Sequence, residues 1–260
     1  DSRGFITAGA LEGAIDADTV LVSIQAANSE LGSVEPVREL AAIAHAHGAL
    51  FHVDATQALG KMPLDVREWD VDAASFSAHK VGGPKGIGAL YVKARTPLLA
   101  FQLGGGQEAG RRSGTQNVMG AAGFAAACRA VCAMEPVESA RLRELRDELY
   151  EKLSQVPGVR PTVDVPRGSV DFLPNIVHVI VSDLESETLI LRLDMKGFGV
   201  SGGSACSSHS LEPSHVLRSI GVEGDDAYGA LRISMGRYTT AEDIDRFLIA
   251  FDEALNWNRG

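Results

Sequence analysis

The chain has 260 residues, of which 45% are hydrophobic and 22% are charged, and its net charge is −10. This is an ordinary globular composition, sufficient for one large domain or two smaller ones. The negative charge argues against a direct nucleic-acid surface, and no apolar run reaches the ~18 residues of a membrane span. Three cysteines do not form a disulfide framework, which favours a reducing, cytoplasmic compartment.

Apolar runs alternate with helical patterns in the first part of the chain, which indicates an α/β architecture with a mostly parallel sheet. A helix is expected after Pro36, ending at Gly48. The predicted strands are residues 20–24, 49–53, 71–77 and 87–92. Residues 1–17 precede a strand that has no upstream partner, so we expect the chain to begin inside a larger protein.

Two helices are predicted next, over residues 118–134 and 137–153, and the basic run Arg141–Arg146 is interpreted as a solvated helix face. Proline and glycine cluster at residues 157–174, which favours a domain boundary. We therefore predict a large domain over residues 1–156 and a small α+β domain over 157–260.

The small domain is predicted to contain two strands separated by helices. The strands cover residues 175–181 and 230–235, and the first helix covers 185–196. A short helix follows Pro213, and a terminal helix begins at Thr240. Asp243 stands three residues after Thr240, in the spacing of a capping box.

The most informative motif is Ser75–Lys80 (SFSAHK), where an apolar strand ends in polar, reactive groups. A lysine at the end of a buried strand loses its proton more easily than one in water, because burial disfavours the charged form. A neutral lysine amine can form a Schiff base. Ser77 and His79 are two residues apart and would share a face of an extended segment, where both could bind a phosphate.

Asp54 stands at the end of another predicted strand, in the pattern HVDATQ that also contains Gln57. Open α/β sheets bind ligands beyond the carboxyl ends of their strands. One interpretation is that Asp54 only caps the next turn. The other is that it pairs with the protonated ring nitrogen of pyridoxal 5′-phosphate (PLP), whose enzymes also need a Schiff-base lysine.

The glycine- and serine-rich segment around Cys206 predicts an exposed, mobile thiol that could act as a nucleophile. His209 leaves open a Cys/His hydrolase dyad. Cys128 and Cys132, spaced i and i+4 on an alanine-rich helix, are instead expected to be buried.

Two further positions suggest anion binding. Thr115 follows a basic pair in RRSGT, ahead of a helix N-terminus that would suit an anion, although a flexible polar loop has the same composition. Arg232 lies between apolar strand residues and needs an anionic partner. That partner is either a substrate carboxylate or a carboxylate of the protein itself.

Together, HVDATQ, SFSAHK, GGPKGIGALYV, RRSGT and SGGSAC resemble the cysteine desulfurase family, and they occur in the order found there. The resemblance extends over essentially the whole chain. It implies the fold-type-I, aminotransferase-like architecture of PLP-dependent transferases, a homodimer, and conversion of L-cysteine to L-alanine with sulfur passed to an acceptor protein. Iron–sulfur cluster assembly, tRNA thiolation and DNA sulfur modification (phosphorothioation) are the pathways served by such enzymes.

The resemblance also implies a role for each motif. Lys80 would carry PLP as a Schiff base, and Cys206 would take up the sulfur as a persulfide. Arg232 would bind the substrate carboxylate. The remaining cofactor ligands would be Asp54, Gln57, Ser77, His79 and Thr115, the last reaching the phosphate of the partner subunit. No resident metal is implied, apart from transient contact of Cys206 with an iron–sulfur cluster.

Two departures from the family pattern stand out. Asn28-Ser29-Glu30 replaces the usual Asn-Asn-Glu, so Asn28 and Ser29 are expected to give a weaker cofactor contact. The family's N-terminal phosphate loop and ring-stacking histidine have no counterpart in this chain. Alternatives are an aminotransferase or selenocysteine lyase on the same fold, or a non-catalytic interaction module.

Overall fold

The computed structural model describes residues 1–203 and 213–257. The chain forms two compact units that are not contiguous in sequence. The first consists of residues 1–7, 27–35 and 136–260, and the second of residues 8–26 and 36–135. These limits differ from the predicted boundary at 156/157. The two units meet between residues 135 and 136, inside helix α3 (Val118–Leu153), and the proline-rich segment lies within the first unit.

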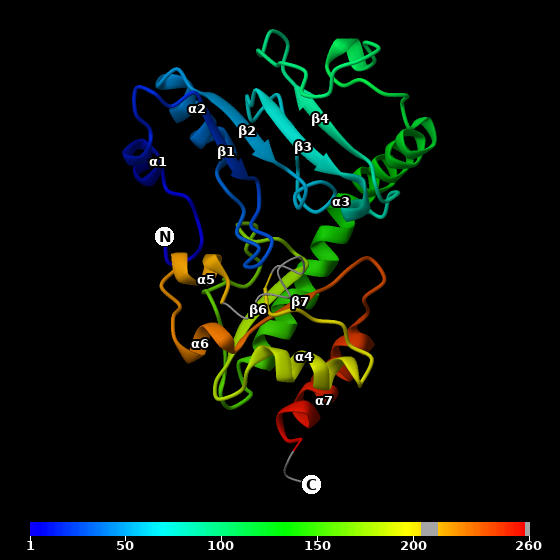
Figure 1. The fold of residues 1–260 in the computed structure, drawn as a ribbon. Helices are drawn as coiled ribbons and strands as arrows, with labels where there is room; N and C mark the ends of the chain where they lie inside the picture. The colour runs from blue at the N-terminus through cyan, green and yellow to red at the C-terminus, as the bar shows by residue number, and fades with distance from the viewer. Residues whose placement is uncertain (204–212, 258–260) are drawn as a thin grey trace. The chain divides into compact units, whose positions relative to one another are not determined.

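The second unit contains a four-stranded sheet in the order β1-β2-β3-β4 (Figure 1). Strands β1 (Leu21–Gln25), β2 (Leu50–Asp54) and β3 (Ala73–Ser77) are parallel, and β4 (Gly88–Val92) is antiparallel to β3. A Cβ on Gly88 would lie 2.5 Å from the carbonyl oxygen of Phe76, so a side chain there would prevent β4 from pairing closely with β3.

The same unit contains two further helices. Helix α1 (Ala8–Ala14) was not predicted, and α2 (Val37–Ala46) follows Pro36 as predicted. The apolar stripe of α2 is buried at Val37, Leu40, Ala41 and Ala44. On the strands, the buried residues are Val22, Phe51, Val53 and Ala74. The alternate positions carry Ser23, His52, Asp54 and Ser75, so the other face of the sheet is polar.

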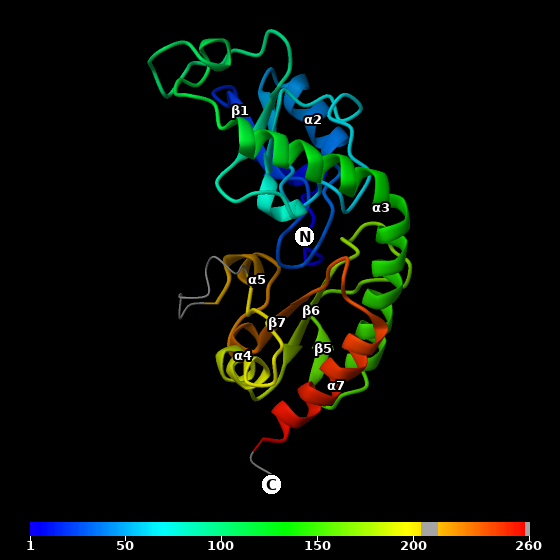
Figure 2. The same cartoon turned by 90° about the vertical axis from the view of Figure 1, so that its right-hand side faces the viewer.

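The first unit contains an antiparallel sheet in the order β5-β6-β7: β5 (Val159–Pro161), β6 (Ile176–Val181) and β7 (Ala230–Ser234). One apolar cluster joins β6 and β7 to the C-terminal half of α3, α4 (Ser186–Asp194) and α7 (Ala241–Leu255). Figure 2 shows α7 beside that half of α3. Two short helices, α5 (His215–Ser219) and α6 (Asp225–Tyr228), complete the unit.

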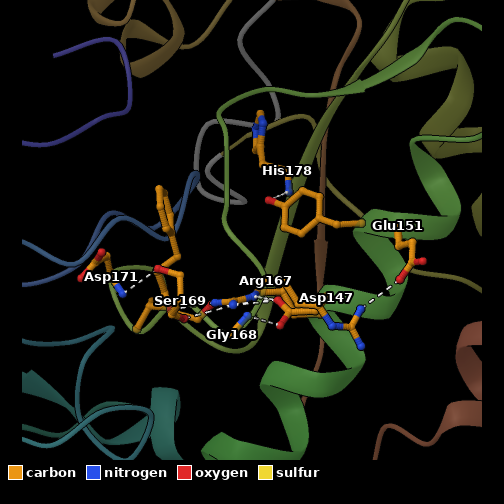
Figure 3. A network of polar contacts seen from close by, with 11 residues as sticks. Asp147, Glu151, Arg167, Gly168, Ser169, Asp171 and His178 are labelled. Atoms are coloured by element: carbon orange, nitrogen blue, oxygen red, sulfur yellow. Dashed lines mark hydrogen bonds and ion pairs between the residues drawn. The ribbon is translucent and has the colours of Figure 1, made fainter.

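Arg146 corrects the expectation of a solvated face on α3, because its side chain is 0% exposed. It donates hydrogen bonds to Asp147 Oδ1 and to the carbonyl oxygens of Ser169, Phe172 and Leu173. Asp147 Oδ2 in turn accepts from the backbone of Gly168 (Figure 3). The buried charge is thus paired and fully engaged, and it anchors the loop between β5 and β6.

That loop also holds residues 27–35 in the first unit. The backbone N–H of Leu173 donates to the carbonyl oxygen of Gly32, and that of Val34 donates to Asp171. Phe172 and Ser33 form an isolated β-bridge. These backbone bonds explain why a short N-terminal segment belongs to the C-terminal unit.

Helix α3 is a single helix, whereas two were predicted. By length and composition alone, α3 is apolar enough to cross a membrane, as some core helices of soluble proteins also are. Cys128 is half-buried and Cys132 is exposed, so the prediction that both are buried is wrong.

Candidate active site

The carboxyl ends of β2 and β3 bring two of the predicted motifs together. Asp54 is the last residue of β2 and pairs in register with Ser75 of β3. The Asp54 carbonyl oxygen accepts from Ala26, which follows β1, at 2.8 Å. Asp54 Oδ1 accepts from the backbone of Thr56 at 2.9 Å, so the carboxylate caps the following turn as one interpretation expected. This capping bond leaves Oδ2 available to a ligand.

Gln57 lies in the same turn. Its Oε1 accepts a 2.7 Å hydrogen bond from the Lys61 amine. The amide group of Gln57 is thereby oriented, and its NH₂ group can still donate to a ligand oxygen.

Strand β3 ends at Ser77, and a single 3₁₀ turn (Ala78–Val81) follows directly. Ser77 Oγ and His79 Nδ1 are 2.7 Å apart, so these two side chains share one face as predicted. The turn ends at Gly82, whose φ of 75° is in the left-handed region that favours glycine. The turn places Lys80 next to the Ser77–His79 pair.

Lys80 is exposed, as is His79. The prediction that the lysine is buried at the strand end is therefore wrong, because the 3₁₀ turn carries it out of the apolar layer formed by Ala78 and Val81. An exposed amine can be reached by a large aldehyde ligand.

Thr115 is exposed in the long loop between β4 and α3. This loop is internally bonded: Ser113 N–H donates to the Gln102 carbonyl oxygen at 3.1 Å, and Gly114 N–H donates to Gln107 Oε1 at 3.0 Å. The loop thus presents the Thr115 side chain to solvent.

The remaining predicted residues lie in the first unit. Arg232 Nη1 donates to the backbone carbonyl oxygen of Ser29 at 2.7 Å. Asn28 Oδ1 accepts from the backbone of Glu30 and Leu31, at 2.8 and 3.0 Å, so this side chain stabilises its own turn. Ser29 therefore acts through its carbonyl group, which any residue at this position would supply.

Cys206 lies outside the described residues. Ser201, which precedes it in the described part of the chain, pairs with β7: the backbone N–H of Arg232 donates to the Ser201 carbonyl oxygen at 2.6 Å, and the Ser201 N–H donates to the Arg232 carbonyl oxygen at 3.1 Å.

His178 was missed by the sequence analysis. It pairs in register with Arg232, is 0% exposed, and contacts Thr162 Oγ1 through Nδ1 at 2.8 Å. Burial and the positive charge of Arg232 lower the pKa of His178 to about 3, so the ring is neutral. Its backbone N–H donates to the hydroxyl of Tyr150, whose own pKa burial raises to about 12. A histidine inside the otherwise apolar strand IVHVIV was the available signal.

Residues 1–247 match the model of the aminotransferase class-V family. The chain therefore belongs to this family of PLP-dependent enzymes, and the predicted α/β, aminotransferase-like fold is confirmed. It is 40% identical over its full length to cysteine desulfurase IscS of Clostridium botulinum, covering 65% of that protein. It is 44% identical over 246 residues to IscS of Salmonella arizonae, covering 59%.

Solved structures give the same family. A NifS-like protein superposes with a TM-score of 0.89 at 37% identity, over 99% of this chain and 67% of that one. SspA in complex with cysteine has a TM-score of 0.72 at 32% identity, over 92% of this chain and 65% of that one. DndA from Streptomyces lividans has a TM-score of 0.71 at 30% identity, over 90% of this chain and 65% of that one. The chain thus spans about two thirds of the length of these relatives.

Proposed function

We propose that this protein is a cysteine desulfurase, which converts L-cysteine to L-alanine and passes the sulfur to Cys206 as a persulfide. The observation that carries the proposal is the clustering of a carboxylate, a hydroxyl–imidazole pair and an accessible lysine at the ends of β2 and β3. The identity to proteins named cysteine desulfurase, and a relative solved with cysteine, support it.

The residues at the sheet edge fit PLP chemically. Lys80 would bind the aldehyde, Asp54 the ring nitrogen and Gln57 the ring oxygen, while Ser77 and His79 would bind the phosphate. The bound cofactor supplies an electron sink for substrate bonds. Asp54 has one carboxylate oxygen engaged by Thr56, which fixes its orientation, and Lys80 is exposed to an incoming ligand.

The sulfur-transfer step balances without an added oxidant. The Cβ–S bond of L-cysteine breaks, an S–S bond to Cys206 forms, and the thiol proton of Cys206 is retained in the products L-alanine and persulfide. Arg232 would bind the substrate carboxylate, and Lys80, once released from the cofactor, would carry protons.

We assign the protein as a homodimer. The loop between β4 and α3 exposes large apolar side chains that a monomer would leave in water: Leu99 is 94% exposed, Phe101 102% and Leu103 82%. A second copy would cover them and receive Thr115 at its phosphate site. Phe101→Glu should convert a dimer to a monomer in sedimentation equilibrium.

The sulfur acceptor is proposed to be a protein of cluster assembly or thiolation, in the cytoplasm. We assign no direct nucleic-acid contact, given the net charge of −10, and propose no membrane contact. No resident metal is assigned, and the described residues contain no group of three or more His, Cys, Asp or Glu placed to hold one.

The decisive experiment incubates the purified protein with PLP, L-cysteine and a thiol reductant, and quantifies alanine and sulfide. Equal amounts of both are expected. Cys206→Ser should abolish sulfide release while PLP stays bound, whereas Cys132→Ser, which alters an exposed thiol on α3, should retain full activity. Amino-group transfer to a keto acid without sulfide would instead establish an aminotransferase, and lack of PLP binding by a folded protein would favour an interaction module.

A further inference from the structure

Three polar side chains form a continuous hydrogen-bonded row across the open face of the sheet in the second unit. Ser23 Oγ of β1 lies 2.7 Å from Nδ1 of His52, and Nε2 of His52 lies 2.8 Å from Ser75 Oγ of β3. Both nitrogens of the imidazole are therefore engaged. Because each hydroxyl comes from a neighbouring strand, the ring is held in one plane from both sides.

This arrangement suits a neutral ring. A neutral imidazole has one donor and one acceptor nitrogen, and a serine hydroxyl can take either complementary role. Burial lowers the pKa of His52, and the nearby Asp54 carboxylate opposes that shift. The strands on either side contribute the uncharged Ser23 and Ser75, so Asp54 is the charged group that faces the ring among the described residues.

The row lies directly beside the predicted cofactor carboxylate. His52 and Asp54 are two residues apart on β2, so their side chains are on the same face. Asp54 is in register with Ser75, whose carbonyl oxygen also accepts from Ala55 at 3.0 Å. Among residues 1–203 and 213–257, no cationic side chain forms an ion pair with Asp54.

We propose that His52 is a positioning residue for the cofactor site: a neutral imidazole that links β1, β2 and β3 through Ser23 and Ser75 and adds no positive charge beside the Asp54 carboxylate. The Asp54 carboxylate can then pair with a cationic ring nitrogen of a ligand. The inference rests on the proposed function, and it adds a residue that supports the strand ends around Asp54.

The test compares the PLP dissociation constants of His52→Phe, His52→Gln and the control His47→Gln, which alters an exposed histidine. His52→Phe should bind PLP about 5- to 10-fold more weakly, because Ser23 and Ser75 lose the ring that joins their strands beside Asp54; a loss of this size corresponds to about one hydrogen bond. Its bound PLP should also show the absorption band of an unprotonated ring. His52→Gln should recover part of the affinity, and the control should match the parent. Parental affinity and spectrum in His52→Phe would overturn the proposal.

A second measurement does not depend on the cofactor. Nitrogen-15 NMR of the cofactor-free protein should show His52 as a single neutral tautomer at pH 7, and Ser75→Ala, which keeps the ring, should allow both tautomers. A doubly protonated ring at pH 7 contradicts the inference even if PLP binds. A neutral, single-tautomer ring in a protein that binds no PLP would instead contradict the proposed function while leaving the hydroxyl clamp in place.

Discussion

Arg232 Nη1 donates a 2.7 Å hydrogen bond to the backbone carbonyl oxygen of Ser29, although the two residues are 203 positions apart in the chain. A backbone atom therefore orients one arm of the guanidinium group. The family resemblance implies asparagine where this chain has Ser29, and that difference leaves this bond unchanged because every residue has the carbonyl group.

Arg232→Lys should raise the KM for L-cysteine at least ~10-fold, because an ammonium group cannot reproduce the two-pronged contact of a guanidinium with a carboxylate. The PLP dissociation constant should not change, since the substitution leaves Asp54, Ser77 and Lys80 intact. Steady-state kinetics and a PLP titration measure the two effects. Ser29→Ala is the control and should keep the parental KM; an unchanged KM in Arg232→Lys would remove the arginine from substrate binding.

Lys80→Ala should abolish covalent attachment of PLP. Reduction with borohydride followed by peptide mass spectrometry should locate the pyridoxyl group on Lys80 in the parent protein and nowhere in the variant. Lys85→Ala, four residues after the 3₁₀ turn and also exposed, is the matched control. Labelling that moves to Lys85 or persists in Lys80→Ala would refute the lysine assignment.

Arg146→Met should lower the free energy of unfolding by about 3–5 kcal/mol, because it leaves Asp147 buried without its cation and the loop carbonyls without their donor. Urea denaturation followed by circular dichroism measures the loss. Arg167→Met removes a surface ion pair with Glu151 (Figure 3) and should change stability by less than about 1 kcal/mol. Equal losses in the two variants would mean that the buried network contributes no special stability.

His178 should make the protein sensitive to acid. Its pKa is about 3 in the folded state, against an ordinary value of 6.5 for histidine. Stability from this group is complete above pH 6.5 and is lost as the pH falls toward 3, because the unfolded chain binds a proton that the folded chain excludes. The loss should reach about 2 kcal/mol at pH 5. In His178→Asn the decline between pH 7 and 5 should be smaller by that amount; His47→Gln serves as the control.

Features that depend on neighbouring residues could be predicted from the sequence. The capping box of Thr240 and Asp243 forms as expected, with the Thr240 hydroxyl accepting from Asp243 N–H at 3.1 Å. The strands that end at Asp54 and Ser77 were also found, because apolar runs and the polar residues after them are local signals. Ser77 and His79 also lie together as expected, although a 3₁₀ turn and not an extended segment brings them into contact.

Features that depend on distant residues could not be predicted. The burial of Arg146 requires carbonyl groups from residues 169–173, which no local pattern connects to α3. The helix continues through Pro136, although proline removes a hydrogen bond; the carbonyl group it leaves belongs to Cys132, on an exposed turn where water can replace the donor. The 3₁₀ turn that exposes Lys80 is likewise set by packing of Ala78 and Val81.

The loop between β5 and β6 holds residues 27–35, and this arrangement constrains synthesis of the protein. Gly32 leaves the ribosome long before Leu173, the residue whose N–H it accepts. At 5–20 residues per second, the segment waits on the order of ten seconds for its partner. During that interval its carbonyl groups and the buried Leu31 and Ser33 lack the neighbours they will have in the native protein. A nascent chain stalled before residue 173 should therefore remain open to proteases at residues 27–35, whereas the complete chain protects them.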